Sequence, residues 1–77
     1  MQRTSVESSM IQSMGYDSSQ ELLEIEFASG AVWQYHDFPP DMWEEFQAAD
    51  SLGRYFKDNI RDCFHEEQIR RTGRYRD

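Results

Sequence analysis

Two large aromatic side chains, Trp33 and Tyr35, stand two positions apart near the middle of the chain and are the clearest candidates for ligand contact. In an extended segment, residues two apart lie on the same face, so the two rings would stand side by side. Such a pair can stack unpaired nucleic-acid bases, at about 1–3 kcal/mol per base. The alternative is that both rings cover the hydrophobic face of a sheet, and the small core expected for so short a chain favours it.

Three basic residues, Arg54, Lys57 and Arg61, form a second candidate site. If this stretch is helical, their spacing places them on one face, with Tyr55 next to them. Such a stripe can contact phosphates while neighbouring aromatic rings stack on bases. The alternative, which we favour on the sequence alone, is a solvated helix face that balances the acidic remainder of the chain.

No group of residues is typical of a catalytic or metal site. Cys63, His65 and Glu66 lie close together, but a zinc site commonly uses four such ligands and the chain has only two histidines. A half-buried cysteine with surface neighbours is the simpler interpretation. Glu24 and Glu26 are expected to face solvent from a strand, and no nucleophile has an evident base. We therefore expect a non-catalytic protein with no cofactor and no metal.

The elements that would position these residues follow from the periodicity of apolar side chains. Alternation of apolar and polar residues predicts a three-stranded antiparallel meander, with turns at Asp17 and Gly30. The predicted strands cover residues 9–16, 21–27 and 31–36.

Two prolines then end the sheet, because proline cannot donate to a strand ladder. Apolar residues at helical spacing predict helices over residues 41–49 and about 52–61. Residues 66–77 contain few apolar side chains and are expected to be mobile or to form a short, fraying helix. The predicted core consists of Ile11, Met14, Leu23, Ile25, Phe27, Trp33, Tyr35, Phe46, Leu52, Phe56 and Ile60.

Charge is unevenly distributed along the 77 residues, whose formal net charge is -7. One basic and ten acidic residues give residues 1–50 a charge of -9, and seven basic and five acidic residues give residues 51–77 a charge of +2. This length accommodates one domain, predicted over residues 1–66, followed by a basic tail over residues 67–77. The tail can contact phosphate or dock on the acidic body of the same or another copy. Its arginines are Arg70, Arg71, Arg74 and Arg76.

The cysteine content and the hydropathy of the chain indicate in which cellular compartment the protein is expected. Cys63 is the single cysteine and cannot form an internal disulfide, which fits a reducing compartment. No apolar run approaches the roughly 20 residues of a membrane span, and no basic-then-apolar leader opens the chain. We therefore expect a cytoplasmic protein that does not bind membranes.

A series of short motifs follows a characteristic order along residues 3–64. They are Val6–Ile11, Met14–Asp17, Leu23–Phe27 with Gly30, Trp33–Tyr35, Phe38 and Pro39, Ala49–Ser51 with Gly53, Tyr55 and Phe56, and Ile60 and Arg61. This ordered combination resembles the KTSC domain family, which occurs at the C-terminus of some lysyl-tRNA synthetases and as free-standing small bacterial proteins. The family usually has Tyr-x-Tyr at its centre, where this chain has Trp33. That substitution removes a phenol hydroxyl but retains a ring that can stack.

The resemblance implies an α+β fold: a small curved sheet, of Sm-like or SH3-like barrel type, packed by one or two C-terminal helices. It also implies a non-catalytic binding module, and the synthetase context suggests RNA, single-stranded or transfer RNA, as the ligand. The predicted nucleic-acid-binding residues are Trp33, Tyr35, Arg54, Tyr55, Lys57 and Arg61. The alternative is a protein–protein interaction or self-assembly module, such as a homo-oligomer, with no nucleic-acid role.

Overall fold

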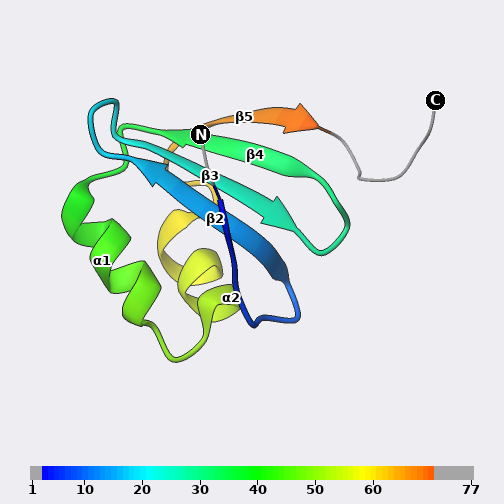
Figure 1. Cartoon of the computed structure of the whole chain (residues 1–77). Coiled ribbons are helices and arrows are strands. Elements are labelled where there is room, and N and C mark those ends of the chain that lie inside the picture. Colours follow the sequence, from blue (N-terminus) through cyan, green and yellow to red (C-terminus); the bar gives the residue numbers. More distant parts are fainter. Residues whose placement is uncertain (1–2, 71–77) are drawn as a thin grey trace.

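A five-stranded antiparallel sheet forms one layer of the protein, and the helices lie on one of its faces (Figure 1). The computed structural model describes residues 3–70. The strands follow each other across the sheet in sequence order. They are β1 (Thr4–Ser5), β2 (Ile11–Asp17), β3 (Leu22–Phe27), β4 (Val32–His36) and β5 (His65–Arg70).

The α+β class is confirmed, but the predicted number of strands and the barrel are wrong. The three expected strands are β2, β3 and β4, and the sheet continues on both sides. It stays open, with β1 and β5 at its two edges. The strand β1 could not be predicted from apolar periodicity, because it consists of only two residues and so shows no alternation.

The strand β5 replaces the mobile segment or fraying helix that was expected from residue 66 onward. Its sequence, His-Glu-Glu-Gln-Ile-Arg, shows no apolar alternation, and the strand forms through its pairing with β4. Backbone pairing of this kind leaves no sequence signal. The boundary predicted at residue 66 stays a prediction, and the predicted tail arginines beyond Arg70 lie outside the described residues.

A bulge in β2 sets which of its side chains face the helices. Ile11 pairs with Phe27 and Ser13 with Glu26, so one extra residue is accommodated between the two pairs. The shift places Ile11 and Met14 together in the core, as predicted for both residues, although strict alternation along the strand would put them on opposite faces.

The helical layer comprises α1 (Pro40–Ala48), α2 (Leu52–Tyr55) and a π-helical turn, η1 (Phe56–Ile60), that continues α2. Pro40 occupies the first turn of α1, where its missing N–H is not needed. Ser51 caps α2, because its Oγ accepts a hydrogen bond from the backbone N–H of Arg54 at 3.2 Å. Both predicted helices are present.

The hydrophobic core lies between the sheet and the helices. Phe38, which the pattern analysis left out, is fully buried just after β4 and packs edge-on against Phe64, with ring centroids 5.1 Å apart. Phe27, Trp33 and Leu52 are only half-buried and pack against the core from its margin. The predicted core residues that are buried are Ile11, Met14, Leu23, Ile25, Tyr35, Phe46, Phe56 and Ile60.

The opposite face of the sheet carries a polar network centred on Glu24 and Glu26. Arg3 pairs with Glu24, and its Nε donates to Ser13 Oγ at 3.1 Å. Arg70 Nη2 lies 2.8 Å from a carboxylate oxygen of Glu26. Glu24 is consequently only 8% exposed, so the prediction that both glutamates simply face solvent was wrong. Within residues 3–70, no helix is long and apolar enough to cross a membrane.

Candidate functional site

The basic residues of the described chain fall into two groups. Arg3 and Arg70 form ion pairs with the glutamates on the outer face of the sheet. Arg54, Lys57 and Arg61 form no ion pair with any residue between 3 and 70, and all three are exposed. The unpaired positive charge of the described chain therefore lies in and just after the second helical segment.

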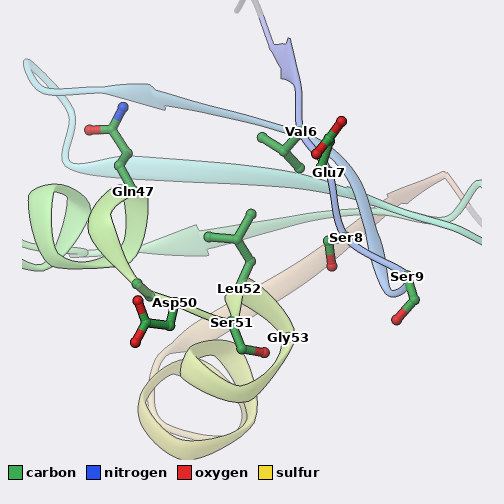
Figure 2. Close-up of a pocket in the computed structure, with 10 residues that line it drawn as sticks. Val6, Glu7, Ser8, Ser9, Gln47, Asp50, Ser51, Leu52 and Gly53 are labelled. Atoms are coloured by element: carbon green, nitrogen blue, oxygen red, sulfur yellow. The ribbon is translucent and has the colours of Figure 1, made fainter.

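Two of these unpaired cations line a groove that sequence reasoning did not predict. It consists of two adjoining hollows of ≈ 460 and ≈ 420 Å³ that share Ser9, Ser51 and Gly53, and we call it the serine groove. Arg54 and Lys57 line the second hollow. Figure 2 shows the first, with the loop that carries Ser8 and Ser9 facing the start of α2. The remaining lining residues are Val6, Glu7, Met10, Gln47, Ala49, Asp50, Leu52 and Asp58.

Local hydrogen bonds and close packing hold both walls of the serine groove. Ser8 Oγ accepts hydrogen bonds from the backbone N–H groups of Met10 and Ile11, each at 3.2 Å. Ser51 caps α2 on the other wall. Gly53 allows the walls to approach, because a Cβ there would lie 3.3 Å from Met10 Sδ. The groove thus joins two motifs more than forty residues apart, and only the family resemblance pointed to both.

The predicted stripe of three cations is not a single surface. Arg61 follows the end of η1 with an extended backbone, and the π-helical turn before it is wider than an α-helical one. The i, i+3, i+7 spacing therefore does not bring Arg61 beside Arg54 and Lys57. Arg61 instead lines a separate hollow next to Asp62.

This separate hollow, which we call the aromatic hollow, has a volume of ≈ 390 Å³. It lies between the β3–β4 hairpin, the C-terminal end of η1 and β5. Trp33 is half-buried in its wall, whereas Tyr35 is only 2% exposed. Tyr35 therefore has no free ring face for base stacking, as the alternative interpretation expected. Its lining residues are Phe27, Ser29, Ala31, Trp33, Tyr35, Phe56, Arg61, Asp62 and Glu66.

The hydroxyl of Tyr35 lies in a negative environment. Burial is the largest cause of its raised pKa, followed by the charges of Glu66 and Asp62. Glu66 pairs with Tyr35 across the β4–β5 ladder, which explains its proximity. The Tyr35 hydroxyl makes no hydrogen bond to the described chain and is reached by solvent, because no fully buried side-chain polar atom within residues 3–70 lacks a partner.

Tyr55, the last predicted stacking residue, already contacts other residues of the protein through both its ring and its hydroxyl. Its ring stacks on Phe46 with centroids 5.3 Å apart, and its hydroxyl donates to Glu45 Oε1 at 2.9 Å. Burial and this carboxylate raise the pKa of Tyr55 to about 12. The residue therefore joins α1 to α2 and offers little ring surface to a ligand.

Residues 3–70 contain no cluster of three or more histidine, cysteine or acidic side chains arranged to hold a metal ion. Cys63 is exposed, which differs from the half-buried position expected for it. His36 and His65 face each other across β4 and β5 with ring centroids 5.1 Å apart, and His36 Nε2 lies 3.2 Å from Glu67.

An open antiparallel sheet with helices on one face defines the chain as a small α+β domain. The family model described as the KTSC domain matches residues 7–64, and the chain belongs to this family. The resemblance deduced from its motifs is thereby confirmed.

Related proteins include both free-standing and fused forms. An uncharacterized protein of Stutzerimonas stutzeri is 46% identical over 56 residues, which are 73% of this chain and 79% of that protein. A lysine–tRNA ligase of Nostoc punctiforme is 36% identical over 63 residues, which are 82% of this chain and 11% of the ligase. A crystal structure of a KTSC domain protein from Yersinia pestis has a TM-score of 0.86 and 38% identity, covering 88% of this chain and 96% of that one.

Proposed function

We propose that the chain is a non-catalytic RNA-binding module that holds phosphates with Arg54 and Lys57 in the second hollow of the serine groove. With Asp58, the charges that line this hollow sum to one positive charge, whereas Glu7 and Asp50 line the first hollow. The observation that carries this proposal is that these two cations have no carboxylate partner within residues 3–70, whereas Arg3 and Arg70 do. An unpaired cation can exchange its counterions for a phosphate without first breaking an internal ion pair. The adjoining hydroxyl of Ser9 can donate to a phosphate oxygen.

The relation to lysine–tRNA ligases supports RNA as the ligand, because the name of those proteins includes a transfer RNA. The chain spans only about a tenth of such a ligase. RNA binding by this chain is therefore our proposal and is not taken over from the ligase as a property. Single-stranded RNA and transfer RNA are the two forms to test.

The net charge of -7 limits how such binding works. Most of the surface repels a polyanion, so contact must be local and must weaken steeply with salt. Tyr35 and Tyr55 are committed to internal packing, and Arg61 and Trp33 line a different hollow. Base stacking by Trp33, Tyr35 and Tyr55 and phosphate contact by Arg61 are therefore not part of the proposal.

The experiment is a salt titration of binding to a short single-stranded RNA and to a transfer RNA. The test variant is Arg54→Gln with Lys57→Gln. Each phosphate contact to a single strand adds about 0.7 to the slope of log affinity against log salt, so losing two lowers the slope by about 1.4.

A charge-matched control separates groove contact from general repulsion. Thr4→Glu with Ser18→Glu makes the same change of net charge at two exposed positions outside the groove. We expect this control to keep the wild-type slope and to lose affinity only slightly. No binding at low salt, or equal loss in the two double variants, would refute the proposal.

One observation favours the alternative of a protein-interaction or self-assembly module. The outer edge of β5 has no neighbouring strand within the described chain, and its Ile69 is 53% exposed. An open edge can accept a strand from a partner or from a second copy.

A further inference from the structure

The aromatic hollow has a chemistry different from that of the serine groove. Trp33 and Phe27 are half-buried and present part of their ring surface to it, while Phe56 and Tyr35 are buried beneath. The ring of Phe56 packs edge-on against both Phe27 and Tyr35, with centroids 5.2 and 5.8 Å apart. Edge-on ring contacts therefore pack the aromatic floor, and a ligand entering the hollow meets aromatic surface.

Two carboxylates stand at the rim of this hollow. Glu66 is fixed beside Tyr35 by the pairing of β5 with β4, and Asp62 occupies a turn with a φ of 63° directly after η1. Neither forms an ion pair within residues 3–70. With Arg61 also unpaired at the rim, the three charges sum to one negative charge.

Tyr35 supplies an independent indication of a ligand. Its ring is almost fully buried and lines the hollow, while its hydroxyl, which bonds to no described residue, is reached by solvent and so can be reached by a ligand. Tyr35 and Glu66 pair across the β4–β5 ladder and line the same hollow together with Asp62, so the hydroxyl and the two carboxylates face a common space. Carboxylates cannot donate to it when ionised, which leaves the hydroxyl oxygen free to accept a bond from a ligand.

We infer that the aromatic hollow is a binding site for a primary alkylammonium group. Its N–H groups would donate to Glu66, Asp62 and the Tyr35 hydroxyl oxygen. Its methylene chain would lie against Trp33 and Phe27, where ring faces attract a cation. Phosphates and carboxylates are repelled by the same rim, and the net charge of -7 attracts cations to the protein as a whole.

The lysine side chain of a partner and a free polyamine share this chemistry. A nuclear magnetic resonance titration that follows the indole N–H signal of Trp33 distinguishes the two sources. The probes are Nα-acetyl-lysine-methylamide and spermidine, with n-butanol as a neutral control of similar shape. The Trp33 signal is identified by its retention in Trp43→Phe.

We expect a saturable shift with at least one of the two cations and none with n-butanol. Glu66→Gln should weaken binding about tenfold, because it removes a charge-assisted hydrogen bond. Tyr35→Phe should weaken it by a smaller factor while preserving the ring packing. The double variant Arg54→Gln with Lys57→Gln should bind the cation as the wild type does, so the result is independent of the RNA proposal.

Arg61→Gln gives the sharpest test, because the sign of its effect depends on the ligand. Removing this rim cation should tighten binding of an alkylammonium, since it removes a like charge. It would weaken binding of a nucleotide, for which uridine monophosphate serves as the probe. The inference is overturned if no cation shifts the Trp33 signal saturably, if n-butanol does so equally, or if Arg61→Gln weakens cation binding.

Discussion

Arg3 and Arg54 carry the same charge but have opposite structural roles. Arg3 covers Glu24, which is 8% exposed and would lose its cationic partner if Arg3 were removed. We expect Arg3→Ala to lower the free energy of unfolding by about 1–3 kcal/mol, because it leaves a buried carboxylate less well satisfied. Arg54→Ala should change it by no more than about 0.5 kcal/mol.

Chemical denaturation of the two variants measures this difference. Equal losses would mean that Arg54 is also engaged within the fold, which would remove the reason for assigning it to a ligand.

Tyr55 provides a residue-scale test by titration. Its pKa is raised from 10.0 to about 12, first by burial and then by Glu45. A raised tyrosine pKa means that the folded state favours the protonated form. The stabilisation is therefore complete below about pH 10 and is lost as the pH rises through about 12.

Glu45→Gln should move the pKa of Tyr55 part of the way back toward 10.0, because the carboxylate charge is removed while burial remains. Absorbance titration near the phenolate band measures it, with Tyr55→Phe identifying the transition. An unchanged midpoint in Glu45→Gln would show that the hydrogen bond between the two side chains is absent in solution.

Among the secondary-structure elements, α2 matters most for the serine groove, because Ser51 and Gly53 at its start line both hollows. Ser51 caps this short helix, and its loss should cost about 1 kcal/mol of stability. Ser9, across the groove, is exposed and makes no side-chain hydrogen bond in the described chain, so Ser9→Ala should be nearly neutral. Thermal or urea unfolding compares the two, and a Ser9 effect as large as that of Ser51 would contradict the geometry.

The sequence predicted those elements whose apolar periodicity matches their environment. β3 alternates cleanly because one face packs on helices, and α1 begins at Pro40 directly after Pro39, with Phe46 buried. β5 could not be predicted, since its residues are polar and its position depends on pairing with β4. The bulge in β2 likewise depends on a partner strand, so alternation alone does not show that Ile11 and Met14 share a face.

The candidate site was only partly predictable for a related reason. Residue types singled out three cations that form no ion pair within residues 3–70 and several large rings, but they did not show how these residues are grouped. The π-helical turn of η1 separates Arg61 from Arg54 and Lys57, and helical spacing alone gives no sign of it. Trp33 and Tyr35 were expected to share a face and do, but that face is the one packed against the helices.

At the scale of the whole molecule, the net charge and the open sheet edge act in opposite directions. Copies with a charge of -7 repel each other at low salt, while the β5 edge with its exposed Ile69 offers a pairing surface. Light scattering should therefore give the monomer mass of 9.2 kDa at low salt.

Any self-association should grow with salt and be reduced by Ile69→Lys, which places a charge on the edge. A dimer that is stable at low salt and unaffected by Ile69→Lys would contradict this prediction and point to another interface.

Mapping the RNA-contacting residues on the folded protein tests whether RNA binds at the serine groove. Backbone amide signals recorded during titration with single-stranded RNA at low salt should shift at Ser9, Gly53 and Lys57, while the Trp33 indole signal stays in place. An RNA that shifts the Trp33 signal and leaves the serine groove unchanged, or one that shifts no signals at all, would contradict the account.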